Sequence, residues 1–186
     1  MDTQQRAYLY AFLSRIFSHK MDEKLIADLK IDTSLLDTLS PEVTHWFLTT
    51  DAVALNDALN VDFSTLFLIH APPIESSILE EKDDVLVGLQ NPVMQFYVAS
   101  GYDVNLTLTD IQTPDHLAIE LAFMQKAVQK DDKEAQRRFL ETHLLVWVIP
   151  YLMGIKGMAA TPFYQNLCEF TCEFLAQDYE ELCSAF

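Results

Sequence analysis

The sequence is poor in glycine and in positive charge, and each scarcity excludes a class of protein. Four glycines occur in 186 residues, and neither a G-x-x-x-x-G-K-[ST] loop nor a G-x-G-x-x-G turn is present, so the common nucleotide-binding motifs are missing. Twelve basic residues oppose 28 acidic ones, for a formal net charge of −16. Because nucleic-acid and anionic-lipid binding need phosphate neutralisation, we expect no nucleic-acid partner and a preference for basic partners.

Long hydrophobic segments are also lacking. The longest uncharged apolar run, residues 144–155, is too short to span a bilayer and contains Pro150, so we expect no membrane insertion. No apolar stretch follows a basic start at the N-terminus, which predicts no export signal and a cytoplasmic protein. The cysteines are odd in number (Cys168, Cys172 and Cys183), which indicates reduced thiols.

The pattern of hydrophobic residues predicts an all-α fold. Half of the residues are hydrophobic, they recur at helical spacing, and no segment shows sustained alternation with period two. At this length we expect a single helical domain of about eight to ten helices. It divides into an N-terminal half (1–101) and a C-terminal half (113–186), joined by a connector at 102–112.

Capping residues and apolar spacing predict the individual helices. Thr113 is the expected N-cap of one of them and Pro114 its first residue, which places Asp115 and His116 in its first turn. The other expected helices run from Thr3 to His19, from Asp22, from Pro41 to Leu59, over 61–69, from Pro92 to Gly101, from Asp131 to Val148 with a kink or end at Pro150, and from Pro162.

The spacing of histidines and carboxylates leaves a metal-dependent enzyme open as an alternative. His116 and Glu120 lie one turn apart, and Glu42 and His45 form a single E-x-x-H, whereas a carboxylate-bridged di-iron bundle needs two such motifs. G-x-S-x-G, H-E-x-x-H and C-x-x-C motifs are missing. We therefore expect no metal and no cofactor. The alternative is a small helical enzyme that uses His116, Glu120 and His143.

Apolar, acidic and imidazole groups occur together in a way that suits peptide binding. Phe63, Leu66 and Phe67 share one helical face directly before the double proline Pro72–Pro73, and the Asp115–His116 pair opens a later helix. An aromatic groove beside an acid and an imidazole suggests recognition of an apolar peptide that carries positive charge. An acidic adaptor for some other basic protein stays open as a further alternative.

The order of motifs resembles the TorD/DmsD/NarJ family of redox-enzyme maturation chaperones. The most specific block is D-H-L-A-x-E-L-x-F-M. The full set comprises L-F (66–67), P-P-x-E-S (72–76), D-H-L-A-x-E-L-x-F-M (115–124), H-L-x-x-W (143–147) and T-P-F-Y (161–164). At Ile74 and at Ile69–His70 the chain departs from the aromatic residue and the glycine that the family commonly has.

The resemblance implies a cytoplasmic, all-helical, non-enzymatic chaperone. Such a protein binds the twin-arginine signal peptide of a molybdenum-cofactor oxidoreductase precursor and delays export until the cofactor is inserted. It is a monomer or a domain-exchanged homodimer. The residues that the motif match implies for the peptide site are Leu66, Phe67, Pro72, Pro73, Glu75, Ser76, Asp115 and His116, and helical spacing adds Phe63 and Glu120. We expect Asp115 to pair with an arginine of the peptide.

Overall fold

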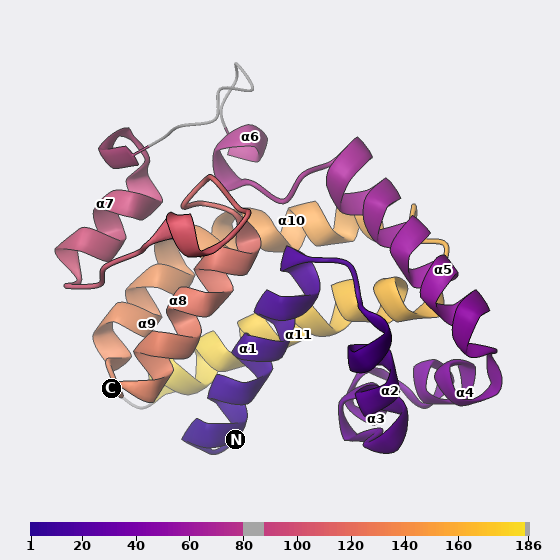
Figure 1. The fold of residues 1–186 in the computed structure, drawn as a ribbon. Helices are drawn as coiled ribbons and strands as arrows, with labels where there is room; N and C mark the ends of the chain where they lie inside the picture. The colour runs from indigo at the N-terminus through magenta and orange to yellow at the C-terminus, as the bar shows by residue number, and fades with distance from the viewer. Residues whose placement is uncertain (80–87, 185–186) are drawn as a thin grey trace. The chain divides into compact units, whose positions relative to one another are not determined.

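The computed structural model describes residues 1–79 and 88–184, which form helices joined by loops (Figure 1). The all-α prediction is confirmed. The α-helices are α1 (Thr3–Ser18), α2 (Glu23–Ile31), α3 (Ser34–Leu39), α4 (Pro41–Thr49), α5 (Ala52–Phe63), α6 (Glu75–Leu79), α7 (Pro92–Ala99), α8 (Leu117–Gln129), α9 (Lys133–Phe139), α10 (Leu145–Lys156) and α11 (Pro162–Ser184). Two π-helical segments, η1 (Ser64–His70) and η4 (Leu140–Leu144), and two short 3-10 helices, η2 (Gly88–Gln90) and η3 (Leu106–Leu108), complete the set.

The chain divides into two compact units. Unit 1 comprises residues 1–18, 73–151 and 174–186, and unit 2 comprises residues 19–72 and 152–173. The proposed connector, 102–112, lies within unit 1 and contains η3. The division into halves on either side of this connector stays a prediction.

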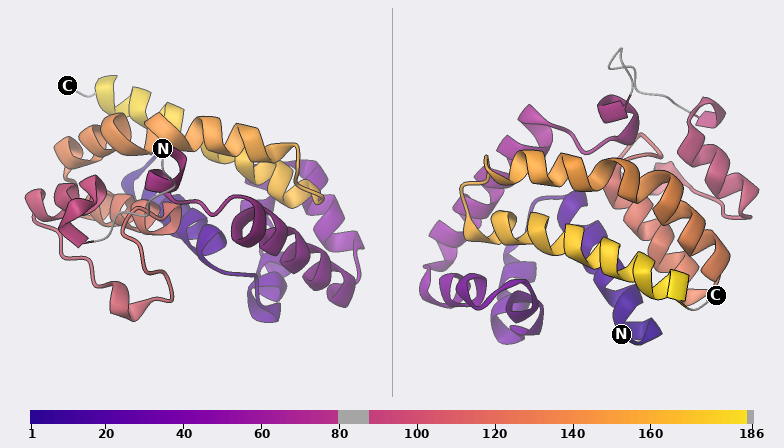
Figure 2. Two further views of the ribbon diagram at one scale, coloured as in Figure 1. Left: turned by 90° about the horizontal axis from the view of Figure 1, so that it is seen from above. Right: turned by 180° about the vertical axis from the view of Figure 1, so that it is seen from behind.

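The core of unit 1 contains α1, α7, α8 and α9. Helix α1 runs alongside α8, as Figures 1 and 2 both show. The Ser14 hydroxyl fixes the start of α8 by donating to the Ala118 carbonyl at 2.7 Å. Three aromatic rings fill the space between α7, α8 and α9: the Phe123 centroid lies 4.8 Å from that of Tyr97 and 4.6 Å from that of Phe139. Such packed rings contribute about 0.5–1.5 kcal/mol per pair beyond burial itself.

A charged network ties α1 to α9 and α11 within unit 1. Arg6 donates from Nε to Asp178 Oδ1 at 2.6 Å and from Nη2 to Asp178 Oδ2 at 2.9 Å. The same Nη2 lies 2.8 Å from Gln136 Oε1, and the Tyr10 hydroxyl donates to Asp178 Oδ2 at 2.8 Å. Because burial and the Asp178 charge raise the pKa of Tyr10 well above its ordinary value, the phenol keeps its proton and stays a donor.

The core of unit 2 is built on α4, α5, η1 and the first part of α11. The Phe47 and Phe163 centroids lie 5.5 Å apart. Buried Asp62 near the end of α5 accepts hydrogen bonds from the Ala160 and Thr161 backbone N–H groups at 3.0 and 2.8 Å, and from the Thr161 hydroxyl at 2.7 Å. The Thr161 hydroxyl oxygen in turn accepts from the Tyr164 N–H at 3.4 Å, which confirms the predicted start of α11.

Most helix positions agree with the sequence, and two do not: the middle of the expected helix from Pro41 to Leu59 and the start of α8. The expected helix from Pro41 to Leu59 is wrong in its middle, because Thr50 is extended and the Asp51 side chain caps a new helix by accepting from Val53 and Ala54. Of the two outcomes expected at Pro150, a kink or an end, the structure excludes the end, since α10 continues to Lys156.

The predicted start of α8 is also wrong. Thr113 does not cap the helix and Pro114 is not its first residue, because α8 begins at Leu117 with His116 as its N-cap. The cause is tertiary. The Leu117 N–H donates to the Pro73 carbonyl, and the Asp115 carbonyl accepts from the Glu75 N–H, both at 2.9 Å, so residues 115–117 pair with a distant segment instead of forming a helical turn.

Two helical stretches are long and apolar enough to span a membrane by length and composition alone, Ala52–His70 and Lys133–Lys156. Buried residues make up 33% and 50% of their most apolar windows, and core helices of globular proteins pass the same test. This is weak evidence for a membrane segment.

Candidate functional site

Residues 73–76 of the P-P-x-E-S motif and the D-H-L motif, about forty residues apart in the chain, meet in unit 1. Ile74 and His116 form an isolated antiparallel bridge. Its two backbone hydrogen bonds, described above, are joined by a third contact, in which the Ser76 N–H donates to Asp115 Oδ2 at 3.0 Å. The structure therefore brings together the predicted site residues Pro73, Glu75, Ser76, Asp115 and His116.

The two residues of the Asp-His pair serve different local purposes. Asp115 is 1% exposed, and its Oδ1 atom has no hydrogen-bond partner among the described residues. His116 accepts a hydrogen bond at Nδ1 from the Ala118 N–H at 3.2 Å, so this nitrogen carries no proton in the folded chain. A neutral imidazole avoids the repulsion that a protonated one would meet at the positive end of α8.

Glu120 lies one turn into α8, is fully buried, and belongs to the same region. Its Oε2 atom accepts a hydrogen bond from Trp147 Nε1 at 3.2 Å. Burial first, and then the Glu75 charge, raise the pKa of Glu120 well above the ordinary value, with Asp115 and a hydrogen bond to Glu75 adding in the same direction. The raised pKa favours the neutral acid form of Glu120, and as an acid it can donate to Glu75.

Glu75 itself faces a histidine. His143 Nδ1 lies 3.0 Å from Glu75 Oε1 and 3.2 Å from Oε2, and both side chains are buried. The Phe139 ring packs against the His143 ring, with 5.0 Å between the two centroids. The Tyr97 hydroxyl donates to the Pro114 carbonyl at 3.2 Å, and burial raises the pKa of Tyr97 well above its usual value, so this donor persists. We call Glu75, Asp115, Glu120 and His143 the buried acid cluster.

The predicted apolar residues lie in unit 2. Phe63, Leu66 and Phe67 are between 0 and 2% exposed. The Phe67 ring centroid lies 5.3 Å from that of Phe63 and 5.6 Å from that of Tyr164. These side chains thus serve the core of unit 2, while their neighbours Leu68 and Ile69 are 58 and 70% exposed.

The double proline lies where the two units divide, because Pro72 is the last residue of its segment in unit 2 and Pro73 the first of its segment in unit 1. Pro72 is exposed and Pro73 is buried. The predicted peptide-binding residues are therefore shared between the units, with the apolar members in one and the polar members in the other.

Sequence reasoning missed two residues that shape the acid cluster and one that fixes the start of α11. Trp147 was noted only for its spacing from His143, although the H-L-x-x-W motif places both side chains on one helical face, which is a usable signal. Tyr97 had no signal, because its partner is a backbone carbonyl from a distant loop. Asp62 likewise gave none, since its partners follow about a hundred residues later.

Comparison with known proteins decides the family. The family model described as "Nitrate reductase delta subunit" matches residues 20–151. The chain belongs to this family. It is 23% identical to the chaperone protein TorD of Histophilus somni, over 94% of this chain and 97% of that protein. It is 30% identical to the chaperone protein TorD of Shewanella loihica, over 96% of this chain and 93% of that protein. The resemblance to TorD/DmsD/NarJ chaperones is confirmed, and the chain is a molybdoenzyme-maturation chaperone and not an enzyme.

The histidines and acids of this chaperone do not form a metal site within the described residues, where no group of three or more such side chains could hold an ion. The alternative enzyme with His116, Glu120 and His143 as ligands also lacks the geometry it needs. His116 caps α8, Glu120 accepts from an indole, and His143 bonds Glu75.

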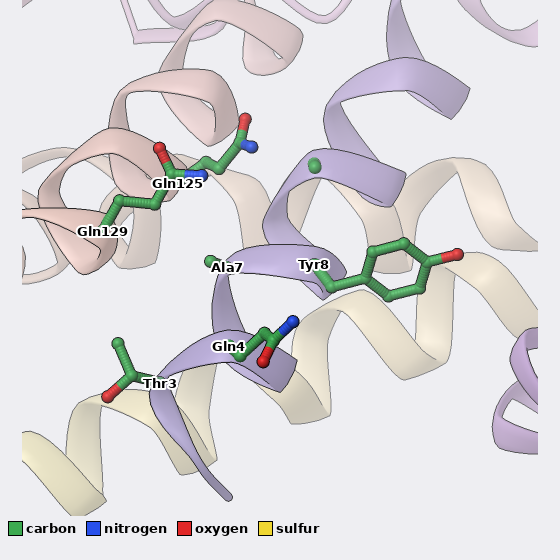
Figure 3. A pocket seen from close by; sticks show the side chains of 7 residues that line it. Thr3, Gln4, Ala7, Tyr8, Gln125 and Gln129 are labelled. Carbon is green, nitrogen blue, oxygen red and sulfur yellow. The ribbon is translucent and has the colours of Figure 1, made fainter.

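The chaperone also has a hollow on the other face of α8, with a volume of about 430 Å³ (Figure 3). Gln125 and Gln129 of α8 line one side of it. The α1 residues that line the other side are Thr3, Gln4, Ala7, Tyr8 and Ala11. Its polar groups are neutral amides and hydroxyls, so it offers no charge to recognise a basic ligand.

Proposed function

We propose that this chaperone acts in the cytoplasm by binding the twin-arginine signal peptide of a molybdoenzyme precursor, and that it delays export until the cofactor is inserted. The observation that supports the proposal most is the buried Asp115 carboxylate, held by the Ser76 N–H at one oxygen and without a partner among the described residues at the other. An acceptor that is buried and not fully bonded is costly, and a guanidinium offers the donors that it lacks.

The apolar part of the peptide needs a separate surface. We assign this surface to the segment before the double proline. Its side chains Leu68 and Ile69 are exposed, and Phe63, Leu66 and Phe67 of the same segment are buried. Most of the affinity should come from burial of apolar side chains, since an exposed ion pair contributes only about 0–1 kcal/mol.

Access to Asp115 requires movement. Because this residue is 1% exposed, an arginine reaches it only when the side chains that cover it shift. Helix α6 is a candidate for that shift, since it has five residues and is held to the Asp-His segment by the Glu75 and Ser76 backbone contacts. A desolvated arginine–carboxylate pair then contributes more than an exposed one, about 1.5–3 kcal/mol.

The test is a calorimetric titration of the full chain with synthetic signal peptides that carry Arg-Arg, Lys-Lys or Gln-Gln. We expect Asp115→Asn to weaken the Arg-Arg peptide by about 10- to 100-fold, as follows from about 1.5–3 kcal/mol, and to weaken the Lys-Lys peptide less. Asparagine keeps an oxygen for the Ser76 N–H, so the local fold is preserved.

Asp103→Asn is the matched control, because Asp103 is an exposed acid of the same unit. It should bind all three peptides as the parent does. Equal losses for the Arg-Arg and Lys-Lys peptides in Asp115→Asn would refute the direct arginine contact. Failure of the parent protein to bind the Arg-Arg peptide would refute the function.

A further inference from the structure

The buried acid cluster holds more negative groups than the described residues neutralise. It has three carboxyl groups, Glu75, Asp115 and Glu120, each at most 7% exposed. His143, at 3.0 Å from Glu75, is the basic side chain that bonds to it. Three charges of one sign in a low-dielectric site repel one another strongly, so at least one carboxyl group must be neutral.

The hydrogen bonds identify Glu120 as the group that carries the proton. As a carboxylate, its Oε1 atom would have no donor among the described residues. As a carboxylic acid, Glu120 can donate to Glu75, while its Oε2 atom still accepts from Trp147 Nε1 at 3.2 Å. Glu75 lies on its other side against His143, whose Nδ1 is 3.0 Å from Glu75 Oε1. A proton on Glu120 therefore provides a hydrogen bond that joins Glu120 and Glu75.

Two polar atoms in the cluster stay without a partner among the described residues, Asp115 Oδ1 and Ser76 Oγ. Asp115 is 1% exposed and Ser76 is 5% exposed, so both are shielded from bulk water. The two residues are neighbours, since the Ser76 N–H donates to Asp115 Oδ2, and a buried carboxylate oxygen without a donor is a place for a cationic donor group. This observation is independent of the proton on Glu120.

We propose that a cation bound at Asp115 and the proton on Glu120 compete, so that the chaperone releases this proton when it takes up an arginine of the signal peptide. This inference rests on the proposed function and adds to it a regulation by pH. The Asp115 charge is one of the causes that hold the proton on Glu120. A guanidinium that neutralises Asp115 removes that cause and adds a positive charge nearby, and both effects favour ionised Glu120.

The sign of the pH effect follows from this exchange. At pH values below those at which Glu120 ionises in the free or the peptide-bound chaperone, Glu120 keeps its proton and binding is weak. Above those pH values Glu120 is ionised already and binding is strong. Between these limits the affinity rises with pH, by at most about tenfold per pH unit for one released proton.

The groups that face Glu120 come from each element around it. Helix α6 contributes Glu75 and the segment before α8 contributes Asp115, while His143 of η4 lies one step away, against Glu75. The uncharged groups are Tyr97 of α7, which keeps its proton, and Trp147 of α10. Since a histidine can also change charge between pH 5 and 8, His143 needs its own variant.

The experiment is calorimetry of the full chain with the Arg-Arg peptide between pH 5.5 and 8.5, in pairs of buffers with different ionisation enthalpies. The difference between buffers counts the protons released. For the parent protein we expect release that approaches one proton and an affinity that rises with pH. For Glu120→Gln, whose amide can still donate to Glu75 and accept from Trp147, we expect binding with no release from this position and a flatter pH profile.

Two controls locate the proton. Glu134→Gln changes an exposed acid of the same unit, and His143→Asn removes the histidine while keeping a donor for Glu75. Both should release protons as the parent does. Binding by the parent without proton release, or unchanged release in Glu120→Gln, would overturn this inference and leave the proposed function standing. Absence of binding at every pH would refute the proposed function itself.

Discussion

Replacement of Asp178 by alanine should destabilise the chaperone strongly. The Asp178 side chain is 0% exposed and accepts two hydrogen bonds from Arg6 and one from Tyr10. Arg6 is only 12% exposed, so the mutation leaves a shielded positive charge and a buried phenol without their acceptor. Loss of one partner of a buried ion pair costs about 3–5 kcal/mol. Because Arg6 keeps its bond to Gln136, we expect the lower end, about 3 kcal/mol.

The assay is thermal unfolding followed by circular dichroism. For a chain of this length, 1 kcal/mol corresponds to about 2–4 °C, so Tm should fall by about 6–12 °C. Glu180→Ala, an exposed acid on the same helix, is the matched control and should stay within about 0.5 kcal/mol of the parent. The double variant Arg6→Leu/Asp178→Leu should lose less than Asp178→Ala, since no charge is stranded. If Asp178→Ala has the same Tm as Glu180→Ala, the reasoning about the network is refuted.

Two further predictions concern unit 2 and the thiols. Asp62→Ala should lower the free energy of unfolding in urea by about 2 kcal/mol, because the start of α11 loses three hydrogen bonds. Asp62→Asn should lower it less. A loss below about 0.5 kcal/mol for the alanine variant would contradict this reasoning. With a thiol-specific reagent at pH 8, exposed Cys183 should react fast, and burial should protect the other two thiols by raising the pKa of Cys168 to about 12 and of Cys172 to about 11. Three equal labelling rates in the folded protein would contradict the burial, and three fast thiols are expected only in denaturant.

The acid cluster has a cost that a purely structural core would avoid. Hydrophobic side chains of similar volume would fill the space without desolvating three carboxyl groups. The cluster sits where the P-P-x-E-S and D-H-L motifs meet, and its hydrogen bonds hold the five-residue helix α6. In the proposed function, the charge state of this cluster sets how firmly α6 is held, and the proton-release experiment tests that dependence.

Several parts of the fold could be predicted from the sequence because they depend on local interactions. The first helix is an example: its apolar residues Phe12, Leu13, Ile16 and Phe17 recur at helical spacing, and all four are buried. Asp22 and Thr161 were also recognised as starts of helices, and both cap their helices through side-chain oxygens. Apolar periodicity and capping depend on residues within a few positions of one another, so they can be read from sequence.

The errors have a common cause. Thr113 and Pro114 are sound local signals for a helix start, yet residues 115–117 pair with the Pro73–Glu75 segment and α8 begins at Leu117. A backbone N–H or carbonyl can be satisfied by a distant partner as well as by a helical turn. Sequence spacing does not show which partner will be chosen.

The sequence by itself determined the helical class, most helix boundaries, the acidic character and, through its ordered motifs, the chaperone family. Those properties depend on composition, on periodicity within single helices and on short motifs. Only the tertiary structure decided that Glu75, Asp115, Glu120 and His143 form one buried cluster, that His116 caps α8, and that Phe63, Leu66 and Phe67 are buried. Burial and charge proximity between residues far apart in the chain raise the pKa of Glu120, and neither exists until the chain is folded.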